Sequence, residues 1–424
     1  MLTAEQNELV TRTGPGTPGG AMMRRYWQPV ALSEELSGHG DPIPVRILSE
    51  DLVLFRDEAG APALMGLRCP HRQTDLSYGR VEDGGLRCVY HGWLFAKDGR
   101  CLEQPGEPAD STYASRVRHT AYPCVEAGGV ILTYMGPGEP PPLPGLPFLR
   151  APAEHSYATK VLHECNYLQG NEGNIDPQHV SFLHRLKSPR RANDRAVNVI
   201  YNDVAPTITI EESPFGFRTY ARRHVDELTD MVRVTNFIMP NLSAFVGTPR
   251  IDPAVQPRDE NDGCQHHWHV PIDDTHHWKY VIVHRYAGPI DRDYCARECN
   301  TQGDERYIPR RNQRNRYGQD RDDMRRGDTF IGMGMRFQDH DKFATESQGA
   351  ICDRSLEHLA TTDRGVITMR RQLLEAIAAV QGGEEPLMIE RVTGADPLAE
   401  MVVRAAFVPK ESETVGFWRS PSPV

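Results

Sequence analysis

Two short motifs of cysteine and histidine constrain this chain more than any other part of its sequence. Cys69-x-His71 comes first, and Cys88-x2-His91 follows after sixteen intervening residues, within CPHRQTDLSYGRVEDGGLRCVYH. Two thiolates and two imidazoles at these spacings can hold a [2Fe–2S] cluster, with the cysteines on one iron and the histidines on the other. Because imidazoles replace two thiolates, such a cluster has less negative charge and a higher reduction potential.

A structural zinc ion is the alternative occupant of these four residues, since Cys2His2 sets also bind tetrahedral Zn2+. A zinc finger usually keeps its cysteines together and its histidines together, with the histidines at helical spacing. Here each half of the motif has one cysteine and one histidine, and the second half continues directly into Gly92-Trp93. The pattern therefore favours the iron–sulfur cluster over zinc.

The segments CPHR and CVYHGW resemble the Rieske domain of ring-hydroxylating non-heme iron oxygenases. Rieske proteins of respiratory complexes have two further cysteines, one soon after the first ligand histidine and one between the second ligand pair, joined as a disulfide. This chain has Arg72 to Asp75 and Val89-Tyr90 at those places, so it resembles the respiratory proteins less. The resemblance implies a cluster of the oxygenase kind, with a lower potential.

At 424 residues the chain is long enough for two domains with separate cores. From about residue 45 to 134, short apolar stretches broken by Gly, Asp and Pro predict a small β domain. The Pro- and Gly-rich segment 136–147 predicts a semi-rigid linker or a strand that wraps around a neighbour. We therefore expect a lead-in over 1–40 with a helix and an extended segment, a cluster domain over 41–150 and a second domain over 151–424.

The second domain is predicted to mix strands and helices, which makes the chain an α+β protein. The segments TITIEE, FGFRTYARRH and WKYVIVHRY alternate as antiparallel strands with one covered face do. Residues 354–380 keep apolar side chains at helical spacing, and Gly382-Gly383 is expected to end that helix. Residues 291–328 are dense in Arg, Asp and Asn, which predicts a solvated, mobile loop.

Charge and cysteine usage limit the class of protein. A net charge of −10 argues against a nucleic-acid surface, which needs clustered positive charge. The start MLTAEQNELV lacks the pattern of a signal peptide, and no run of eighteen apolar residues predicts a membrane span. Seven cysteines outside the cluster motif are widely spaced, as in reduced cytosolic proteins, and Cys295-x3-Cys299 has no obvious partner pair. We expect a cytoplasmic protein that binds neither nucleic acid nor membrane.

A second candidate metal motif, Asp176-x2-His179-x4-His184, lies in NYLQGNEGNIDPQHVSFLH. Two histidines and one carboxylate on one face of an iron leave the other face open for O2, and such ligands suit iron better than calcium or magnesium. On a regular helix His179 and His184 would point about 140° apart, so a shared metal requires a widened turn or a break. By spacing alone, a helix with scattered histidines is the alternative.

Asp176 precedes a proline, which is a common helix start with Asp as the N-cap. A carboxylate at this place can also orient a ligand imidazole and fix its tautomer. In the resembling family this aspartate links the cluster of one subunit to the iron of the next. The family's third iron ligand lies a few residues before a glutamate, and FQDHDKFATESQG is the matching stretch. Asp341, five residues before Glu346, is the expected ligand, and Asp339 is the runner-up.

Two further sets of residues, five histidines and three arginines, could belong to a binding site. The segment CQHHWHVPIDDTHHW (264–278) has five histidines, but alternation along a strand would place them on both faces, so most are expected to be packing or surface residues. One of them is left open as a pocket residue. Arg218, Arg222 and Arg223 can pair with a substrate carboxylate, although outward-facing strand positions are the favoured interpretation.

The resemblance covers nearly the whole chain, including AMMRRYWQPVALSEEL, both metal motifs and ESQGAICDRSLEHL. These look like the phthalate-dioxygenase group of Rieske oxygenases. Membership implies a β-sandwich Rieske domain, then a catalytic domain whose antiparallel sheet is covered by helices in a helix-grip, START-like arrangement. It also implies an α3 homotrimer without a small β subunit.

The resemblance implies a terminal oxygenase component. Electrons would enter at Cys69, His71, Cys88 and His91 and pass through Asp176 of a neighbour to Fe(2+) on His179, His184 and Asp341. Oxygen from O2 would then enter an aromatic substrate, carboxylated or not, by hydroxylation or cis-dihydroxylation. Oxidative O- or N-demethylation is one alternative. A Rieske electron carrier without mononuclear iron is the alternative from another class.

The chain has no GxGxxG fingerprint and no plant-type ferredoxin cysteine set, so it cannot take hydride from NADH unaided. We therefore expect a separate NAD(P)H-dependent reductase, of the kind with a flavin and a plant-type ferredoxin centre. The other partners expected are O2 and the small-molecule aromatic substrate.

Overall fold

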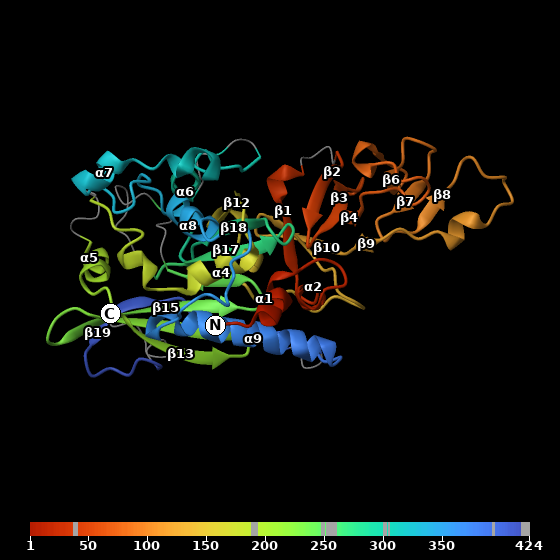
Figure 1. Cartoon of the computed structure of the whole chain (residues 1–424). Coiled ribbons are helices and arrows are strands. Elements are labelled where there is room, and N and C mark those ends of the chain that lie inside the picture. The colour runs from red at the N-terminus through yellow and green to blue at the C-terminus, as the bar shows by residue number, and fades with distance from the viewer. Residues whose placement is uncertain are drawn as a thin grey trace.

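The computed structural model describes residues 1–36, 41–187, 194–246, 251, 261–299, 303, 306–391 and 395–416. Figure 1 shows a larger body built around one long-stranded sheet and a smaller lobe that projects from it. The lobe contains β2 to β9, and the larger body contains the strands from β12 onward. None of the described helices is long and apolar enough to cross a lipid bilayer.

The first part of the chain forms three small antiparallel sheets. One has the order β1–β11–β10, made of β1 (Gln28–Leu32), β11 (Val130–Thr133) and β10 (Cys124–Ala127). The next has the order β2–β3–β4–β9, made of β2 (Ile43–Ile47), β3 (Glu50–Arg56), β4 (Pro62–Gly66) and β9 (Ala121–Tyr122). The last has the order β5–β6–β7–β8, made of β5 (Arg80–Glu82), β6 (Gly85–Arg87), β7 (Leu94–Ala96) and β8 (Cys101–Glu103). The predicted small β domain is confirmed.

The residues before the first sheet form more than an extended lead-in. Helix α1 (Ala4–Thr11) begins at a capping box on Thr3, and α2 (Pro18–Met23) follows with proline at its first position. Both helices contact α9 of the larger body, whereas β1 pairs with β11. The first 36 residues therefore connect the two parts of the molecule, and the boundaries at residues 40 and 150 stay predictions.

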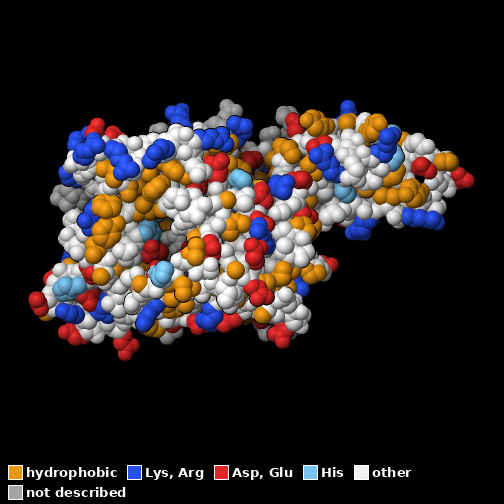
Figure 2. Space-filling view, in the orientation of Figure 1, with side chains coloured by type: hydrophobic (Ala, Val, Ile, Leu, Met, Phe, Trp, Pro, Cys, Tyr) orange, Lys and Arg blue, Asp and Glu red, His pale blue; other side chains and the backbone are white. Residues whose placement is uncertain are grey.

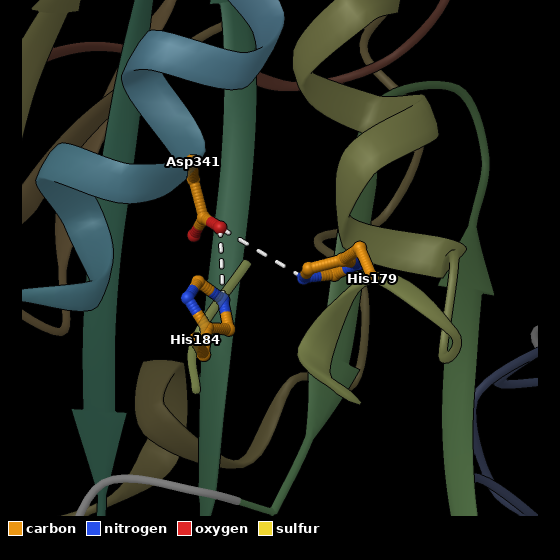
Figure 3. Close-up of side chains that lie close together, drawn as sticks. All are labelled: His179, His184 and Asp341. Atoms are coloured by element: carbon orange, nitrogen blue, oxygen red, sulfur yellow. Dashed lines mark ion pairs between the residues drawn. The ribbon is translucent and has the colours of Figure 1, made fainter. Parts of the chain in front are cut away.

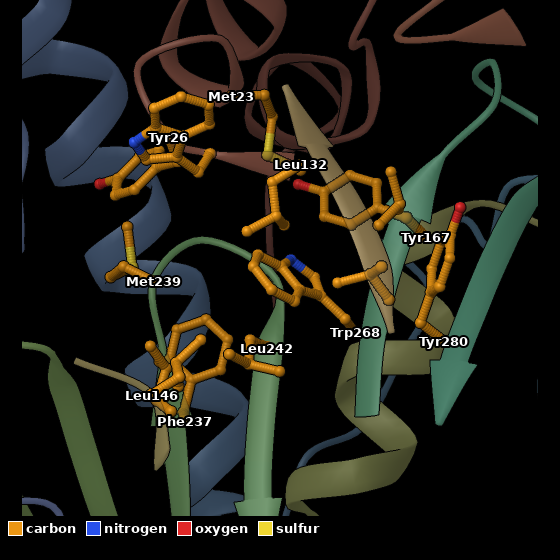
Figure 4. Packing of buried hydrophobic residues seen from close by; sticks show 14 of the residues in the cluster. Met23, Tyr26, Leu132, Leu146, Tyr167, Phe237, Met239, Leu242, Trp268 and Tyr280 are labelled. Atoms are coloured by element: carbon orange, nitrogen blue, oxygen red, sulfur yellow. The ribbon is translucent and has the colours of Figure 1, made fainter. Parts of the chain in front are cut away.

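One hydrophobic core runs across the junction between the lobe and the larger body. Met23 and Tyr26 from the first segment, and Leu132 from β11, belong to the same buried cluster as Leu242 and Trp268 (Figure 4). Shared burial of this kind fixes the two parts against each other, because separating them would expose large apolar side chains to water.

The larger body is an antiparallel sheet with the order β12–β18–β17–β16–β15–β14–β13, and β19 pairs with the free part of β15. Its strands are β12 (Ser156–His163), β13 (Thr207–Ser213), β14 (Gly216–His224), β15 (Thr229–Ile238), β16 (Leu242–Phe245), β17 (Cys264–Pro271), β18 (His277–His284) and β19 (Ala405–Pro409). The three predicted strand segments correspond to β13, β14 and β18, so their positions are confirmed. β14 and β18 are buried on both faces, so the expectation of a single covered face is wrong for these two strands.

Helices cover this sheet, as the α+β prediction requires. Helix α4 (Tyr167–Ile175) packs on β15, β16 and β17, α9 (Arg364–Gln381) packs on β13 and β14, and α8 (Phe337–Glu346) packs on α4. A buried carboxylate joins α4 to α9, because Glu172 Oε1 accepts hydrogen bonds from Arg354 Nε at 2.8 Å and Arg370 Nε at 2.7 Å. Burial would raise the pKa of Glu172, but the two guanidinium groups outweigh it and lower that pKa.

The prediction of one helix over 354–380 is wrong in its first turns. Residues 354–363 form turns and a short 3-10 helix, η7 (Thr361–Asp363), and α9 begins only at Arg364. The polar contacts of this stretch explain the difference, since Arg354 is fully buried against Glu172 and Asp353 accepts from the backbone of Ser355. The glycines at 382 and 383 end the helix as predicted.

The prediction of a mobile loop over 291–328 is also wrong for the part that the structure describes. That part includes α6 (Arg292–Cys299), the 3-10 helix η6 (Gln313–Gly318) and α7 (Arg321–Arg326); residues 300–302 and 304–305 lie outside the described residues. Cys295 and Cys299 are buried against Val281 and Val283 of β18. The composition of this stretch is dominated by charged residues, so it gives no sign of the apolar face that α6 buries.

The remaining α-helices of the described residues are α3 (Pro147–Arg150) and α5 (Arg195–Asn202).

Candidate metal centres

The first motif lies in two loops of the lobe, one after β4 and one between β6 and β7. Cys69 and Cys88 are only 1% and 2% exposed and belong to the small hydrophobic core of the lobe. His71 and His91 are exposed. The cysteines therefore face the core and the histidines face the surface, which is the order that a cluster with two chemically different irons requires.

The two loops have the same local geometry. The backbone N–H of Gln73 donates to the carbonyl of Cys69 at 2.8 Å, and that of Gly92 donates to the carbonyl of Cys88 at 2.9 Å. Gln73 and Gly92 both have positive φ, 62° and 76°. Each cysteine thus starts a five-residue turn that folds the following residues back. The rings of His71 and His91 approach with centroids 4.5 Å apart, and Trp93 stacks on His71 at 4.4 Å.

The donor set fits an iron–sulfur cluster. Burial and the neighbouring Cys88 raise the pKa of Cys69 to about 11, although backbone N–H groups of His71 and Arg72 directed at the sulfur lower it in part. Burial thus favours the protonated thiol of Cys69, and a bound cationic centre would favour the thiolate that a cluster needs.

The second motif brings three side chains to one point (Figure 3). One ligand atom each of His179, His184 and Asp341 lies within 4.8 Å of the others, and within the described part of the chain no other group of three such residues is found. Asp341 Oδ1 is 3.0 Å from His184 Nε2 and 3.8 Å from His179 Nε2. Both imidazoles therefore present the same ring nitrogen to the carboxylate.

A break after α4 allows the two histidines to converge, as their spacing predicts. The helix ends at Ile175, and a short 3-10 turn, η5 (His179–Ser181), follows. The carboxylate of Asp176 stabilises this turn by accepting from the backbone N–H of Gln178 at 2.7 Å and of His179 at 3.3 Å. Asp176 is thus the C-cap of α4 and not the N-cap of a long helix, so the helix-start interpretation is wrong.

Asp341, the carboxylate of this group, lies on helix α8. Glu346, one turn after Asp341, accepts from Tyr317 Oη at 2.8 Å and from the backbone of Glu164 at 2.6 Å, and it pairs with Lys342. These buried contacts hold α8 against its neighbours. Asp339 lies elsewhere, with Oδ2 at 3.7 Å from Arg311 Nε. The geometry supports Asp341 over Asp339, and the assignment stays a prediction.

The hydrogen bonds behind the imidazoles leave their inner nitrogens free to bind a metal. His340 Nε2 lies 2.9 Å from the carbonyl of Gly334 and must donate to it, so the Nδ1 of a neutral His340 accepts. His184 Nδ1, 3.2 Å away, is then the donor, and His184 Nε2 keeps its lone pair. His179 Nδ1 faces Asp176 Oδ2 at 3.4 Å, which is long for a hydrogen bond but leaves Nε2 directed inward.

The electrostatics of the group suit a divalent cation. Burial lowers the pKa of His184 to about 4. Burial would raise the pKa of Asp341, but His184 and Lys279 outweigh it and hold that pKa well below its usual range. Burial would lower the pKa of His179, but the carboxylates of Asp176 and Asp341 raise it, an effect that a bound cation would oppose. The same interaction with His179 lowers the pKa of Asp176 against the effect of burial.

The histidine-rich segment lies on β17 and at the start of β18, and its histidines occupy both faces as predicted. His266 packs against Phe148 with ring centroids 4.9 Å apart, whereas His267 and His269 contact Asn174 of α4 on the other face. Four of the five histidines are buried, and only His276 is partly exposed. The prediction that these histidines are packing or surface residues is therefore met by packing for four of them and by exposure for His276 alone.

These buried histidines form a hydrogen-bond chain with one direction. His277 Nδ1 must donate to the carbonyl of Cys165 at 2.8 Å, so His277 Nε2 accepts from His269 Nδ1 at 2.9 Å. His269 Nε2 then accepts from the Asn174 amide at 2.6 Å, and His267 Nδ1 donates to Asn174 Oδ1 at 3.1 Å. The chain keeps the imidazoles neutral, in agreement with burial lowering their pKa values. It holds the end of α4 against the sheet.

The three arginines on β14 are all engaged within the protein. Arg218 pairs with Glu211 at 3.2 Å, and Arg222 pairs with Asp230 at 2.7 Å. Arg223 donates to the backbone carbonyl of Pro177 at 2.6 Å, directly after Asp176. Arg218 and Arg223 are only 2% and 1% exposed, so the outward-facing interpretation is wrong for these two.

Sequence reasoning missed His340, Lys279 and Arg223 as neighbours of the second motif. Lys279 Nζ lies 3.4 Å from Asp341 Oδ2 and is fully buried. A charged residue within the apolar run WKYVIVH was the only signal for it. His340 is adjacent to Asp341 in the sequence, but nothing in the sequence shows that its ring faces His184.

The fold and these two groups define a class of protein. Its small β domain has a cluster motif, and its second domain, built on an antiparallel sheet, has a group of two histidines and one carboxylate. The family described as Rieske [2Fe-2S] domain matches residues 26–121, and the family described as LigXa C-terminal domain like matches residues 133–421. The chain belongs to the Rieske non-heme iron oxygenases. It is an oxidoreductase, and its cofactors are a [2Fe–2S] cluster and a mononuclear iron.

Two relatives and one solved structure illustrate the similarity. The oxygenase subunit of phthalate 4,5-dioxygenase from Pseudomonas putida is 38% identical, over 91% of this chain and 89% of the relative. The oxygenase subunit of 5,5'-dehydrodivanillate O-demethylase from Sphingobium sp. is 33% identical, over 92% and 84%. The reduced complex between oxygenase and ferredoxin in carbazole 1,9a-dioxygenase has a chain with TM-score 0.54 and 18% identity, covering 87% of this chain and 93% of that one. This last likeness concerns the fold.

Proposed function

We propose that this chain is the terminal oxygenase of a system that adds oxygen from O2 to a small aromatic substrate. The convergence of His179, His184 and Asp341 in a chain that also has the cluster motif carries this proposal. An electron carrier without mononuclear iron would have no use for three such ligands with one atom of each directed at one point. In this proposal the three residues hold the iron, and Cys69, His71, Cys88 and His91 hold the cluster.

The roles of the residues follow from their contacts. When bound, iron at this site would supply the activation of O2 with electrons from the cluster. Asp341 offers one anionic oxygen to the site, and His184 is oriented by His340 through its Nδ1. Asp176 faces the outer nitrogen of His179 and fixes the turn that carries it. His184 is buried, whereas the side chains of His179 and Asp341 are 21% and 22% exposed, so the site is partly accessible from solvent.

An aromatic substrate is proposed because the phthalate 4,5-dioxygenase subunit is 38% identical over nearly the whole chain. Hydroxylation or cis-dihydroxylation is then the proposed reaction. Oxidative O-demethylation is the second candidate, because the 5,5'-dehydrodivanillate O-demethylase subunit is 33% identical over a similar length. Arg218, Arg222 and Arg223 do not supply a free clamp for a substrate carboxylate, since each is paired within the protein.

Substrate-dependent O2 uptake with product analysis tests this function. The purified protein, a Rieske-oxygenase reductase and NADH are combined with benzoates, phthalates and methoxybenzoates. The expected result is O2 uptake coupled to a ring-hydroxylated product, or to formaldehyde and a phenol in the case of demethylation. Electron uptake by the cluster without any oxygenated product, in protein shown to contain mononuclear iron, would contradict the proposal.

We propose that electrons pass between subunits of a homotrimer. Figure 1 shows the lobe with β6, next to Cys88, projecting away from the larger body, whereas α8 lies within that body. A head-to-tail ring would bring the lobe of one subunit to the iron site of the next, since a heterologous interface repeats the same contact until the ring closes. Asp176 would then form a bridge between a cluster histidine of one subunit and His179 of its own.

Asp176→Asn is expected to leave both metals bound while intersubunit electron transfer slows by about 10- to 100-fold. The amide keeps the size of the side chain but loses the charge and one acceptor, and partners of metal ligands typically contribute 10- to 100-fold. Stopped-flow reoxidation of the reduced cluster in the presence of O2 and substrate measures the rate. Unchanged reoxidation would remove Asp176 from the electron path.

Mixed trimers test the same path without altering Asp176. Chains with Cys69→Ser lack the cluster, chains with His179→Ala lack the iron, and neither homotrimer should turn over. Mixtures should recover part of the activity, because an intact cluster then lies beside an intact iron of the neighbouring subunit. Inactive mixtures with verified subunit exchange and metal content would place the transfer within one chain.

The exposed surface around the cluster motif suits contact with other proteins. Val89 and Tyr90, between the two ligands of the second half-motif, are 54% and 53% exposed, and Figure 2 shows hydrophobic side chains on this lobe. We propose a separate reductase as the electron donor, with a flavin and a plant-type ferredoxin centre, in line with the ferredoxin complex of the carbazole oxygenase. A cytoplasmic location is proposed with it, because none of the nine cysteines forms a disulfide.

A further inference from the structure

The two carboxylate oxygens of Asp341 have different partners, and Lys279 contacts only one of them. Oδ1 lies 3.0 Å from His184 Nε2 and points into the group of candidate ligands, whereas Oδ2 lies 3.4 Å from Lys279 Nζ. The two histidines and the lysine therefore contact different oxygens of one carboxylate. Figure 3 shows the consequence, with one oxygen of Asp341 directed at both imidazoles and the other turned away.

The surroundings of Lys279 offer its ammonium group few ion-pair partners other than Asp341. Its side chain is only 1% exposed, on β18, and its register partner on β17 is His269. His269 and His267 on the same face are neutral in the directional hydrogen-bond chain, and Lys279 contributes to lowering their pKa values. Among the described residues, Asp341 is the acidic group within ion-pair distance of Lys279.

We propose that Lys279 is a positioning residue that withholds Oδ2 of Asp341 from the metal, so that the aspartate binds through Oδ1 alone. A carboxylate can bind a cation through one or both oxygens, and an ammonium on one of them opposes the second mode by competing for the oxygen and repelling the cation. Binding through one oxygen would leave one more position free on a metal held here. This inference rests on the proposed metal site.

The test compares Lys279→Met with Lys279→Arg in the purified holoenzyme. Removing the ammonium should allow both oxygens to bind, so Fe(II) release to the chelator ferrozine should slow by about tenfold, equivalent to about 1.4 kcal/mol. The high-spin EPR signal of the nitric oxide adduct should also change shape, because the ligand set changes. Lys279→Arg keeps a cationic donor and should retain the wild-type release rate and signal. The oxidised cluster is EPR-silent and does not obscure this signal.

Lys160→Met is the matched control for loss of a buried lysine. Lys160 is 6% exposed and pairs with Glu35 at 2.6 Å, between η1 (Ser33–Glu35) and β12. It should leave iron release and the EPR signal unchanged. Lys279→Gln replaces Lys279→Met if the latter does not fold, and the same slower release is expected. Equal or faster release from the neutral variants, or an unchanged signal, would overturn the inference. Absence of mononuclear iron from the wild-type protein would instead overturn the proposed metal site.

Discussion

His184→Ala is expected to abolish turnover and remove the mononuclear iron while leaving the cluster intact. The imidazole lies 3.0 Å from Asp341 and 5.0 Å, ring to ring, from His179, so its loss leaves two ligands where three converge. The cluster motif belongs to a different hydrophobic core and should not respond. Iron analysis, the Rieske EPR signal of the reduced protein and O2 uptake on one sample measure all three effects.

The carboxylates of α8 offer a matched pair for the same site. Asp341→Ala should lose the iron, because Asp341 faces both imidazoles. Asp339→Ala should keep it, because Asp339 faces Arg311 and its main effect would be on the packing of α8. The reverse pattern, iron lost with Asp339→Ala and kept with Asp341→Ala, would show that the ligand has been placed two residues too late.

Cys88→Ala is expected to remove the [2Fe–2S] cluster and its red-brown colour, and with it all reductase-dependent turnover. The thiol is 2% exposed and lies beside Cys69, so no solvent-facing group can replace it. Cys101→Ala is the control, because Cys101 is buried in the same small core but lies outside the motif. It should keep the cluster at somewhat lower stability.

His71→Cys provides a graded version of the cluster prediction. A cluster that assembles with a third thiolate should have a potential lower by roughly 200 mV or more, given the gap between Rieske and all-cysteine clusters. Protein-film voltammetry or redox titration followed by EPR measures the shift. A colourless wild-type protein with one zinc ion per chain would contradict the entire assignment of these four residues.

The sequence predicts the positions of the long strands well, although β14 and β18 prove to be buried on both faces. The strands β13, β14 and β18 lie where alternation places them, because side chains of a strand point to opposite faces. The segments 291–328 and 354–363 were mispredicted for a different reason. Their local composition is polar, and the buried partners that order them, such as Val281 for Cys295 and Glu172 for Arg354, lie far away in the sequence.

In the candidate sites, too, the sequence indicates what is local and misses what depends on distant contacts. The cluster motif and the pair His179 and His184 are local in sequence, so spacing alone indicates their chemistry. Asp341 comes from α8, and only the resemblance pointed to it. Lys279 and His340 are positioned by tertiary contacts, on Asp341 Oδ2 and His184 Nδ1, which no spacing rule expresses. Arg223, which the sequence offered as a substrate contact, instead holds the backbone next to Asp176.

The number of irons per chain separates an oxygenase from an electron carrier. We expect three irons per chain in the fully loaded protein, two of them in a cluster with a Rieske EPR signal in the reduced state and one released by ferrozine without loss of that signal. Metal analysis, EPR spin quantitation and chelation on a single preparation give the three values. Two irons per chain, both in the cluster, even after reconstitution with Fe(II), would contradict the account and leave an electron carrier.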